Sequence, residues 1–315
     1  MTSSTVLLTG GSGVVGWELT TRFARAGFGV YLLVRKGSRK ALRERVSAFR
    51  LTDAAAADRV RLFTGDLLAP HITDDESRSR IVAECDGVVH AACERRSDKP
   101  RDQVFDTNLG GTRALLELAG TLEKPLRRFM HVSDFSVVGD HRGVFFEDDL
   151  FVGQGFGADV AAESRLLAER HVRRAMRSVP ATVVRLAHPV VNKRDPARVA
   201  DPLAGLGRGS RRARWAQWLV HADPPLVHAL PLDLMGRAVL AAFEEPDMAG
   251  GTLHVADPAA PTVTELLTAL GRSGSAYSLG LPAEGARLDT TGADALLRHA
   301  GIGRPSLADL AAALS

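Results

Sequence analysis

The chain has 315 residues, of which 45% are hydrophobic, so it can build one large domain or a domain with a smaller lobe. Its 40 basic and 37 acidic residues nearly cancel, and the net charge of +3 excludes a dedicated nucleic-acid binder. The two cysteines, Cys85 and Cys93, are too few for a disulfide framework. We therefore expect a cytoplasmic protein whose thiols are reduced.

The start of the sequence lacks the features of a secretory signal. Residues 1–4 contain no basic residue and lead directly into an apolar run. No apolar run approaches the roughly 18 residues that a membrane-spanning helix needs. We therefore expect no membrane partner.

Short apolar segments alternate with segments of helical periodicity through the first 190 residues. The expected strands are Thr5–Thr9, Gly29–Val34, Val60–Phe63, Gly87–His90, Phe129–Val132 and Ala181–Arg185. Nearly continuous apolar strands separated by helices indicate a parallel sheet that is covered on both faces. The sequence therefore predicts an α/β fold, with a Rossmann-type doubly wound parallel sheet and a small C-terminal substrate lobe.

The alternating pattern loosens after residue 190. A Gly-, Pro- and Arg-rich stretch, Asn192–Arg214, indicates an inserted lobe or a loop. We expect residues 1–190 to form the dinucleotide-binding domain, with contributions from about 226–256. Residues 191–225 and 257–315 would form the substrate-binding lobe. The late helices are expected at Asp233–Phe243, Thr262–Leu270, Thr291–Ala300 and Ser306–Leu314.

A glycine-rich turn follows the first expected strand. It reads Thr9-Gly10-Gly11-Ser12-Gly13-Val14-Val15-Gly16 and opens a segment of helical periodicity. Gly10, Gly13 and Gly16 suit a tight turn, a close approach to a pyrophosphate, and close packing of helix on strand, respectively. The helix N-terminus would offer backbone N–H groups to the phosphates. In this setting the motif predicts a dinucleotide site, the alternative being a glycine turn without a ligand.

The second expected strand ends at Val34 and is followed by Arg35 and Lys36. An acidic residue at such a strand end binds a free 2′-hydroxyl, whereas arginine suits a 2′-phosphate. The pair therefore favours NADP(H) over NAD(H), the alternative being a solvated basic loop.

Further motifs follow in the order of a known family. They are Gly65-Asp66-Leu67 after the third strand, His90-Ala91-Ala92 after the fourth, Asn108 with Gly111-Thr112 at a helix start, Pro231–Met235 and Leu288–Pro305. With the glycine turn, they make the chain resemble an extended short-chain dehydrogenase/reductase, most closely the thioester-reductase and male-sterility branch. The resemblance extends over nearly the whole chain.

The resemblance implies a cofactor across the C-terminal edge of the sheet and a substrate beneath the C-terminal lobe. In this family Asp66 would meet the adenine, and Arg165 would hold the nicotinamide ribose. The implied cofactor residues are Thr9, Gly10, Ser12, Gly13, Val14, Val15, Gly16, Arg35, Lys36, Asp66, Leu67, Ala91, Ala92, Asn108 and Arg165.

The catalytic residues of that family are changed in this chain. The Ser or Thr that polarises the carbonyl falls on Asp134, the proton-transferring tyrosine on Ala161, and the lysine on Arg165. The two tyrosines of the chain, Tyr31 and Tyr277, lie at other positions. The pattern argues against ordinary ketone reduction with the family's own residues.

A rebuilt proton relay would restore catalysis. We expect an ion pair between Asp134 and Arg165, which would lower the pKa of the aspartate. Arg165 stays protonated and cannot act as a base. His188, after the sixth strand, is the other candidate for proton transfer, the alternative being a surface or supporting role.

Other polar residues are expected to be structural. His131 is interpreted as a core histidine with satisfied hydrogen bonds, and Cys93 as a small packing residue. Ser133 and Glu163 are expected to point away from the reaction site. No Cys or His spacing indicates a metal site.

Three functions remain open at this stage. The first is an NADP-linked oxidoreductase that acts on a small or carrier-bound carbonyl compound, with Asp134, His188 and Arg165 as its catalytic residues. The second is a non-redox cyclase, dehydratase or isomerase in which NADP is structural. The third is a binding protein that senses NADP(H). The fold alone does not decide between them.

Two segments bear on partners. The stretch Arg208–Trp218 combines arginines with tryptophans, and it suits either contact with an acidic carrier or an ordinary amphipathic helix. The amphipathic segments Arg101–Gly120 and Ala161–Arg177 correspond to helices through which relatives dimerise, so a homodimer is expected.

Overall fold

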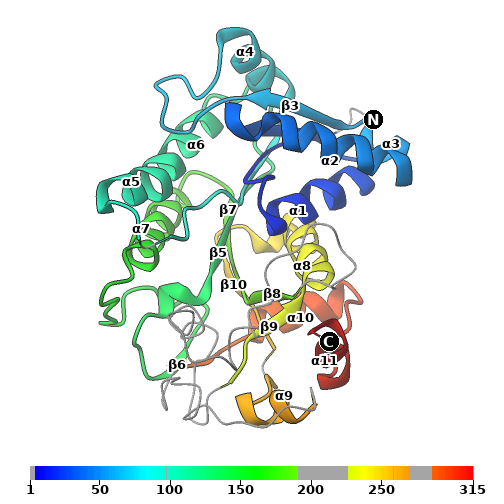
Figure 1. Ribbon diagram of the computed structural model, residues 1–315. Coiled ribbons are helices and arrows are strands. Elements are labelled where there is room, and N and C mark those ends of the chain that lie inside the picture. The colour runs from blue at the N-terminus through cyan, green and yellow to red at the C-terminus, as the bar shows by residue number, and fades with distance from the viewer. Residues whose placement is uncertain (1–3, 97, 191–225, 258, 270–285, 315) are drawn as a thin grey trace. The chain divides into compact units, whose positions relative to one another are not determined.

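The computed structural model describes residues 4–96, 98–190, 226–257, 259–269 and 286–314 (Figure 1). These residues form two compact units. The first consists of residues 1–133, 157–184 and 242–251, and the second of residues 134–156, 185–241 and 252–315, each over its described positions. The domain boundaries from the sequence stay predictions, and the stretches Asn192–Arg214 and Arg208–Trp218 lie outside the described residues.

A seven-stranded sheet has the order β10-β7-β5-β4-β1-β2-β3. Its strands are β1 (Thr5–Thr9), β2 (Gly29–Val34), β3 (Val60–Thr64), β4 (Gly87–His90), β5 (Arg128–Asp134), β7 (Ala181–Leu186) and β10 (Thr252–Val255). The pairs β1–β2, β1–β4, β2–β3 and β4–β5 are parallel. Because the chain order reverses between β1 and β4, their carboxyl ends form the switch point where ligands of doubly wound sheets bind. The predicted Rossmann-type fold is confirmed.

Helices cover both faces of this sheet in the first unit. They are α1 (Val14–Arg25), α2 (Arg39–Thr52), α3 (Ala54–Ala57), α4 (Asp75–Glu84), α5 (Arg101–Phe105), α6 (Gly111–Ala119) and α7 (Val160–Ala175). Leu115 of α6 and Val172 of α7 share one buried cluster with Phe129 of β5. Phe23 of α1 packs against Phe28 and Phe243, with ring centroids 5.3 and 5.1 Å apart. Burial of these side chains is the main source of the unit's stability.

The helix that contains Asn108 differs from its prediction. A π-helical turn, Asp106–Gly110, connects α5 to α6 without a break, so Asn108 lies inside a helix and not at a helix start. Such π-helical turns within α-helices occur frequently at functional sites. The helix start that the family motif implied at Asn108 is therefore wrong, whereas the expected helical segment Arg101–Gly120 agrees with the structure.

The second unit contains two small parallel sheets. β6 (Gly143–Phe145) pairs with β11 (Ala286–Leu288), and β8 (His188–Val190) pairs with β9 (Ala229–Pro231). Its helices are α9 (Val263–Ala269), α10 (Thr291–His299) and α11 (Leu307–Leu314), and α8 (Leu232–Glu244) begins in it. The short turns η1 (Lys36–Ser38), η3 (Phe135–Val138) and η6 (Pro246–Met248) complete the described elements outside the π-helical turn. Every helix in the described part of the chain is too short or too polar to cross a lipid bilayer.

Candidate functional site

The glycine turn between β1 and α1 has no room for side chains at two positions. Gly10 has φ +85°, and a Cβ there would lie 2.5 Å from the carbonyl carbon of Ala91. A Cβ on Gly16 would lie 2.2 Å from the carbonyl oxygen of Gly10. The first turn of α1 therefore packs directly on the turn, and the turn packs on the segment Ala91–Ala92 that follows β4. This is the close backbone packing that the glycine spacing predicts.

The N-terminus of α1 is open to a ligand. Ser12 and Gly13 are exposed, and Val14 and Val15 are half-buried. Gly13 is the N-cap residue, and no side chain in the described part of the chain caps the helix there. The first backbone N–H groups of α1 can therefore serve an anion, as the phosphates of a dinucleotide require.

A cavity of about 430 Å³ lies at the carboxyl ends of β2 and β3. Arg35 and Lys36 line it from one chain segment, and Thr64 and Asp66 line it from the other. Arg39, at the start of α2, hydrogen-bonds the hydroxyl of Thr64. The cavity thus combines two cationic side chains with one carboxylate. The cation Arg39 was not foreseen from the sequence.

A chain of hydrogen bonds connects the glycine turn to α6. Thr112 Oγ1 donates to the carbonyl oxygen of Asn108 at 2.6 Å, so it accepts from His90 Nε2–H at 3.0 Å. His90 Nδ1 is then the acceptor for the Thr9 hydroxyl at 2.8 Å. Complete burial, with a smaller effect from His131, lowers the pKa of His90 well below 6.5. His90 is therefore a neutral connector between β1, β4 and α6, and the sequence motif did not indicate this role.

Asn108 uses its whole side-chain amide within the protein. Its Nδ2 donates to the carbonyl of Glu94 at 2.9 Å and to Ser164 Oγ at 2.8 Å. Its Oδ1 accepts from the backbone N–H of Glu94 at 2.6 Å. The residue therefore fixes the loop after β4 and the start of α7 on the π-helical turn, which is a positioning role. Direct contact with a cofactor stays a prediction.

The changed catalytic positions on α7 face inward. Ala161 is fully buried and Arg165 is 7% exposed, and Asp159 caps the helix by accepting from Ala162 N at 3.0 Å. Glu163 lies on the other side, where its carboxylate forms two 2.7 Å contacts with Arg101. The expected orientation of Glu163 is therefore correct.

The end of β5 places neighbouring side chains on opposite sides of the strand. Asp134 Oδ1 accepts from Ser136 N at 3.0 Å and from the Ser136 hydroxyl, so it caps the turn η3. Ser133 Oγ donates to the buried carboxylate of Glu169 at 2.5 Å. Ser133 therefore points away from Asp134, as the sequence predicts.

His131 is a core residue, but its hydrogen bonding differs from the prediction. It is 5% exposed, and its Nδ1 has no hydrogen-bond partner in the described structure. Its ring centroid lies 5.4 Å from that of His90, because the two residues are paired across β4 and β5. Burial lowers the pKa of His131 to about 4, against the opposing effect of Glu169. The prediction of a fully satisfied histidine was wrong, since none of the described residues forms a hydrogen bond with Nδ1.

Cys93 and His188 lie in surroundings that differ from those predicted. Cys93 is exposed and is not the packing residue that the sequence suggested. His188 is 8% exposed and begins β8, where its backbone N–H binds the carbonyl of His228 at 2.9 Å. It is a buried strand residue and does not lie on an open loop.

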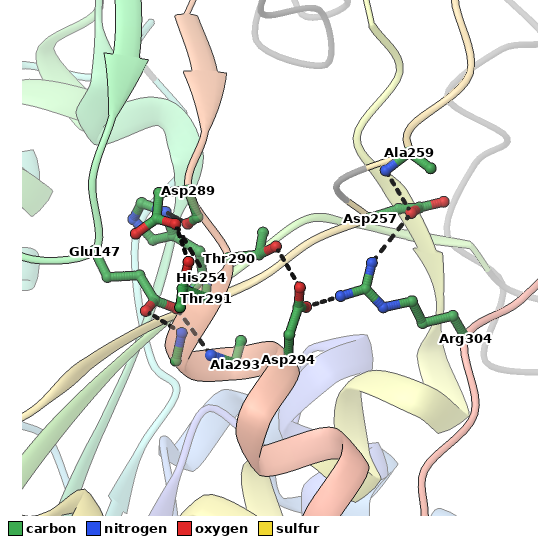
Figure 2. A network of polar contacts seen from close by, with 11 residues as sticks. Glu147, His254, Asp257, Ala259, Asp289, Thr290, Thr291, Ala293, Asp294 and Arg304 are labelled. Carbon is green, nitrogen blue, oxygen red and sulfur yellow. Dashed lines mark hydrogen bonds and ion pairs between the residues drawn. The ribbon is translucent and has the colours of Figure 1, made fainter.

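The N-terminus of α10 is capped by a distant carboxylate in the second unit (Figure 2). Glu147 accepts from the backbone N–H groups of Gly292 at 2.8 Å, Ala293 at 3.1 Å and His254 at 2.8 Å. Burial raises the pKa of Glu147, and these three N–H groups oppose the shift. Glu147 therefore has a structural role, and it joins the segment after β6 to β10 and α10.

The first turn of α10 is also held through Asp294. Asp294 pairs with Arg304 and accepts from Thr290 Oγ1 at 3.1 Å, and Arg304 lies 3.8 Å from Asp257 (Figure 2). These contacts tie the segment after α10 back to the segment after β10.

Arg185 is fully buried in the second unit beside His254. Its guanidinium donates to the carbonyl of Asp149 at 2.6 Å and to His254 Nε2 at 2.8 Å. His254 Nδ1 lies 2.6 Å from the carbonyl of Asp289, so Nδ1 carries the proton and Nε2 accepts. His254 is thus held as one neutral tautomer, and both side chains serve the architecture.

The sequence profile of a family of NAD-binding proteins, described as male sterility protein, matches residues 8–211. The chain belongs to this family. The resemblance to the male-sterility branch of the extended short-chain dehydrogenase/reductases is thereby confirmed.

Curated relatives of this male sterility family member match only in part. The NRPS-like oxidoreductase fscA of Fusarium equiseti is 27% identical over 135 residues, which is 42% of this chain and 13% of that protein. The dTDP-glucose 4,6-dehydratase of Mycolicibacterium smegmatis is 34% identical over 143 residues, which is 43% of this chain and 38% of that protein. The chain spans well under half the length of these relatives.

Solved structures resemble the chain over its whole length. The terminal R domain from the myxalamid PKS-NRPS biosynthetic pathway gives a TM-score of 0.80 at 22% identity, covering 100% of this chain and 90% of that one. Yeast methylglyoxal/isovaleraldehyde reductase Gre2, solved with NADPH, gives 0.70 at 16% identity, covering 98% and 97%. At these identities the likeness shows a common fold.

In this family member, the first unit brings most of the predicted cofactor residues to one edge of the sheet. The glycine turn, Asp66 with Leu67, and Ala91 with Ala92 all follow strand ends there. The predicted catalytic residues are divided, since Arg165 belongs to the first unit and Asp134 and His188 to the second. The Asp134–Arg165 ion pair stays a prediction.

Proposed function

We propose that this protein is an NADP(H)-dependent oxidoreductase that acts on a small or carrier-bound carbonyl compound. One observation carries the proposal. Arg35, Lys36 and Asp66 line a single cavity at the carboxyl end of β2. The neighbouring strand β1 pairs with β2 and leads into the N-terminus of α1, which is open to a ligand. This arrangement fits the adenosine 2′-phosphate and the pyrophosphate of one extended ligand.

The residues present fit such a cofactor. The open backbone at Ser12 and Gly13 would hold the pyrophosphate, and Arg35 with Lys36 would hold the 2′-phosphate. A bound nicotinamide cofactor supplies hydride transfer. The protein itself supplies orientation, which rests on the Gly10–Gly16 backbone and on the His90 and Asn108 contacts behind it.

Because Ala161 replaces the family's tyrosine, other groups would have to transfer the proton. Asp134 and His188 are the titratable candidates, and Arg165 can orient a ligand but cannot act as a base. Asp134 is buried and accepts two hydrogen bonds from Ser136. An ionised Asp134 would act as a base, in the direction of alcohol oxidation.

Binding is tested by titrating the purified protein with NADPH, NADP+ and NADH and following fluorescence. We expect NADPH to bind more tightly than NADH, and Arg35→Ala to remove most of that preference. Arg43→Ala, an exposed arginine of α2 that does not line the cavity, is the matched control and should leave both affinities unchanged. Failure of every dinucleotide to bind would refute the proposal.

Catalysis is tested by following the nicotinamide absorbance with a panel of aldehydes, alcohols and thioesters. Loss of a general acid or base lowers a rate by about 10²–10⁴-fold. We expect one of Asp134→Asn and His188→Gln to show such a loss in kcat while NADPH binding is kept. Full activity in both variants would remove these residues from the mechanism.

A second candidate is a non-redox dehydratase on the same scaffold. The absence of tyrosine at Ala161 and the similarity to a dTDP-glucose 4,6-dehydratase favour it. Substrate conversion without a net change in nicotinamide absorbance would decide for this candidate over the first.

A further inference from the structure

His71 lines the same cavity as Arg35 and Lys36, from the loop that follows β3. Its side chain is exposed, whereas the next residue, Ile72, is 4% exposed and belongs to the buried core of the unit. Ile72 is therefore anchored in the core, and the neighbouring His71 is exposed at the cavity.

The backbone at Ile72 is strained. Its φ is +63°, and among the described residues other than glycine no other has a positive φ. Thr73 N donates to the carbonyl of His71 at 2.6 Å, so Ile72 is the central residue of a γ-turn with positive φ, which is a rare and unfavourable turn. A β-branched residue is poorly suited to this conformation. Strain of this kind persists only where surrounding contacts enforce it, and it concentrates at ligand-binding sites.

Several contacts enforce the turn. The carbonyl oxygen of Ile72 accepts from Asp66 N at 2.7 Å, and Thr73 Oγ1 donates to the carbonyl of Thr64 at 2.7 Å. Gly65 lies so close that a Cβ there would be 2.4 Å from the Ile72 carbonyl oxygen. The loop is thus fixed on the end of β3, the strand end at which Asp66 lines the cavity. The backbone at His71 is therefore fixed before any ligand binds.

We propose that His71 is a third ligand of the 2′-phosphate and adds to the preference for NADP(H) over NAD(H) that Arg35 and Lys36 provide. The inference rests on the proposed cofactor function and deepens it. An imidazole donates an N–H hydrogen bond in its neutral and its protonated form, so it can bind the phosphate in either state. Arg35 and Lys36 supply the opposing positive charge from the end of β2. The adenosine of NAD(H) has no 2′-phosphate for His71 to bind, so His71 favours NADP(H) over NAD(H).

The test uses 2′,5′-ADP and 5′-AMP as probes, with binding to the full chain measured by calorimetry. A hydrogen bond to a charged group is worth about tenfold or more in affinity. We expect His71→Ala to weaken 2′,5′-ADP roughly tenfold and to change 5′-AMP by less than twofold. His71→Gln, which keeps an N–H donor, should recover part of the loss. His299→Ala, at an exposed histidine of α10, is the matched control and should change neither probe.

The outcomes separate this inference from the proposed function. If the unaltered protein prefers 2′,5′-ADP and Arg35→Ala removes the preference while His71→Ala does not, the role of His71 is refuted and the NADP(H) proposal stands. If the unaltered protein binds neither probe, both are refuted. Equal weakening of both probes by His71→Ala would also refute the inference, because a purely structural role would act on both.

Discussion

Protonation of His131 should make the folded state sensitive to mild acid. His131 is 5% exposed on β5, and its Nδ1 has no hydrogen-bond partner in the described structure. Burial lowers its pKa to about 4 from an ordinary value of 6.5. In the unfolded chain the ring would regain the ordinary value.

The sign and size of the effect follow from these two values. Below pH 6.5 the unfolded chain takes up a proton that the folded His131 refuses until about pH 4. Stability is therefore complete above pH 6.5 and falls as the pH is lowered towards 4. Each pH unit in this window costs about 1.4 kcal/mol, so His131 alone costs about 2 kcal/mol between pH 8 and pH 5. His90, whose pKa burial also lowers, should add to the loss.

The assay compares the parent protein with His131→Phe, which keeps a ring of similar size. Urea unfolding at pH 8 and pH 5 gives the free energy of unfolding at each pH. We expect the variant to lose about 2 kcal/mol less than the parent over this interval. NMR spectra of the imidazole nitrogens assign the His131 signal as the one that the variant lacks. His299→Gln, at an exposed position, is the control and should lose as much stability as the parent.

Either of two results would refute this reasoning. One is an assigned His131 signal that titrates near the ordinary value of 6.5. The other is an equal loss of stability in the parent and in His131→Phe. Either would mean that water or a rearranged neighbour solvates the ring in the folded state.

The remaining predictions concern the glycine turn, the capping carboxylate and the π-helical turn. Gly16→Ala should lower stability by about 1–3 kcal/mol in thermal unfolding, because its Cβ meets the Gly10 carbonyl oxygen at 2.2 Å. A Cβ on Gly13 would lie 3.3 Å from the Gly10 carbonyl oxygen, so Gly13→Ala should fold normally but bind NADPH less tightly. Unchanged NADPH binding would mean that the pyrophosphate binds elsewhere. Glu147→Ala should cost about 3 kcal/mol or more in urea unfolding, since three buried N–H groups lose their acceptor, and a cost near zero would contradict the capping role. Asn108→Leu should weaken NADPH binding and speed amide hydrogen exchange at the start of α7, and unchanged exchange would count against its positioning role.

The strands and the glycine turn could be predicted because their signals are local. A strand buried on both faces appears as a short apolar run, and β1, β2 and β4 have the expected bounds. The glycines at 10 and 16 are required by contacts within one turn and with the next strand end, so their spacing carries the information. The missing tyrosine at Ala161 is also a property of the sequence alone.

The helix boundary and the hydrogen bonding that the sequence predicted wrongly depend on contacts between distant segments. Asn108 was placed at a helix start by resemblance to the family motif, yet it lies inside a continuous helix, where it bonds to Glu94 and Ser164. His131 could be recognised as buried, but only packing decides whether a donor reaches its Nδ1.

The sequence by itself determined the order of the elements, the type of ligand that the glycine turn favours and the loss of the family's catalytic residues. Tertiary structure alone decided that Glu147 caps a helix 145 residues away, that Ile72 takes a left-handed conformation, and that His71 reaches the cavity of Arg35. Local sequence patterns reflect the preferences of neighbouring residues. A cap, a strained turn or a shared cavity results from the packing of segments that are far apart in the chain, and such packing can override those preferences.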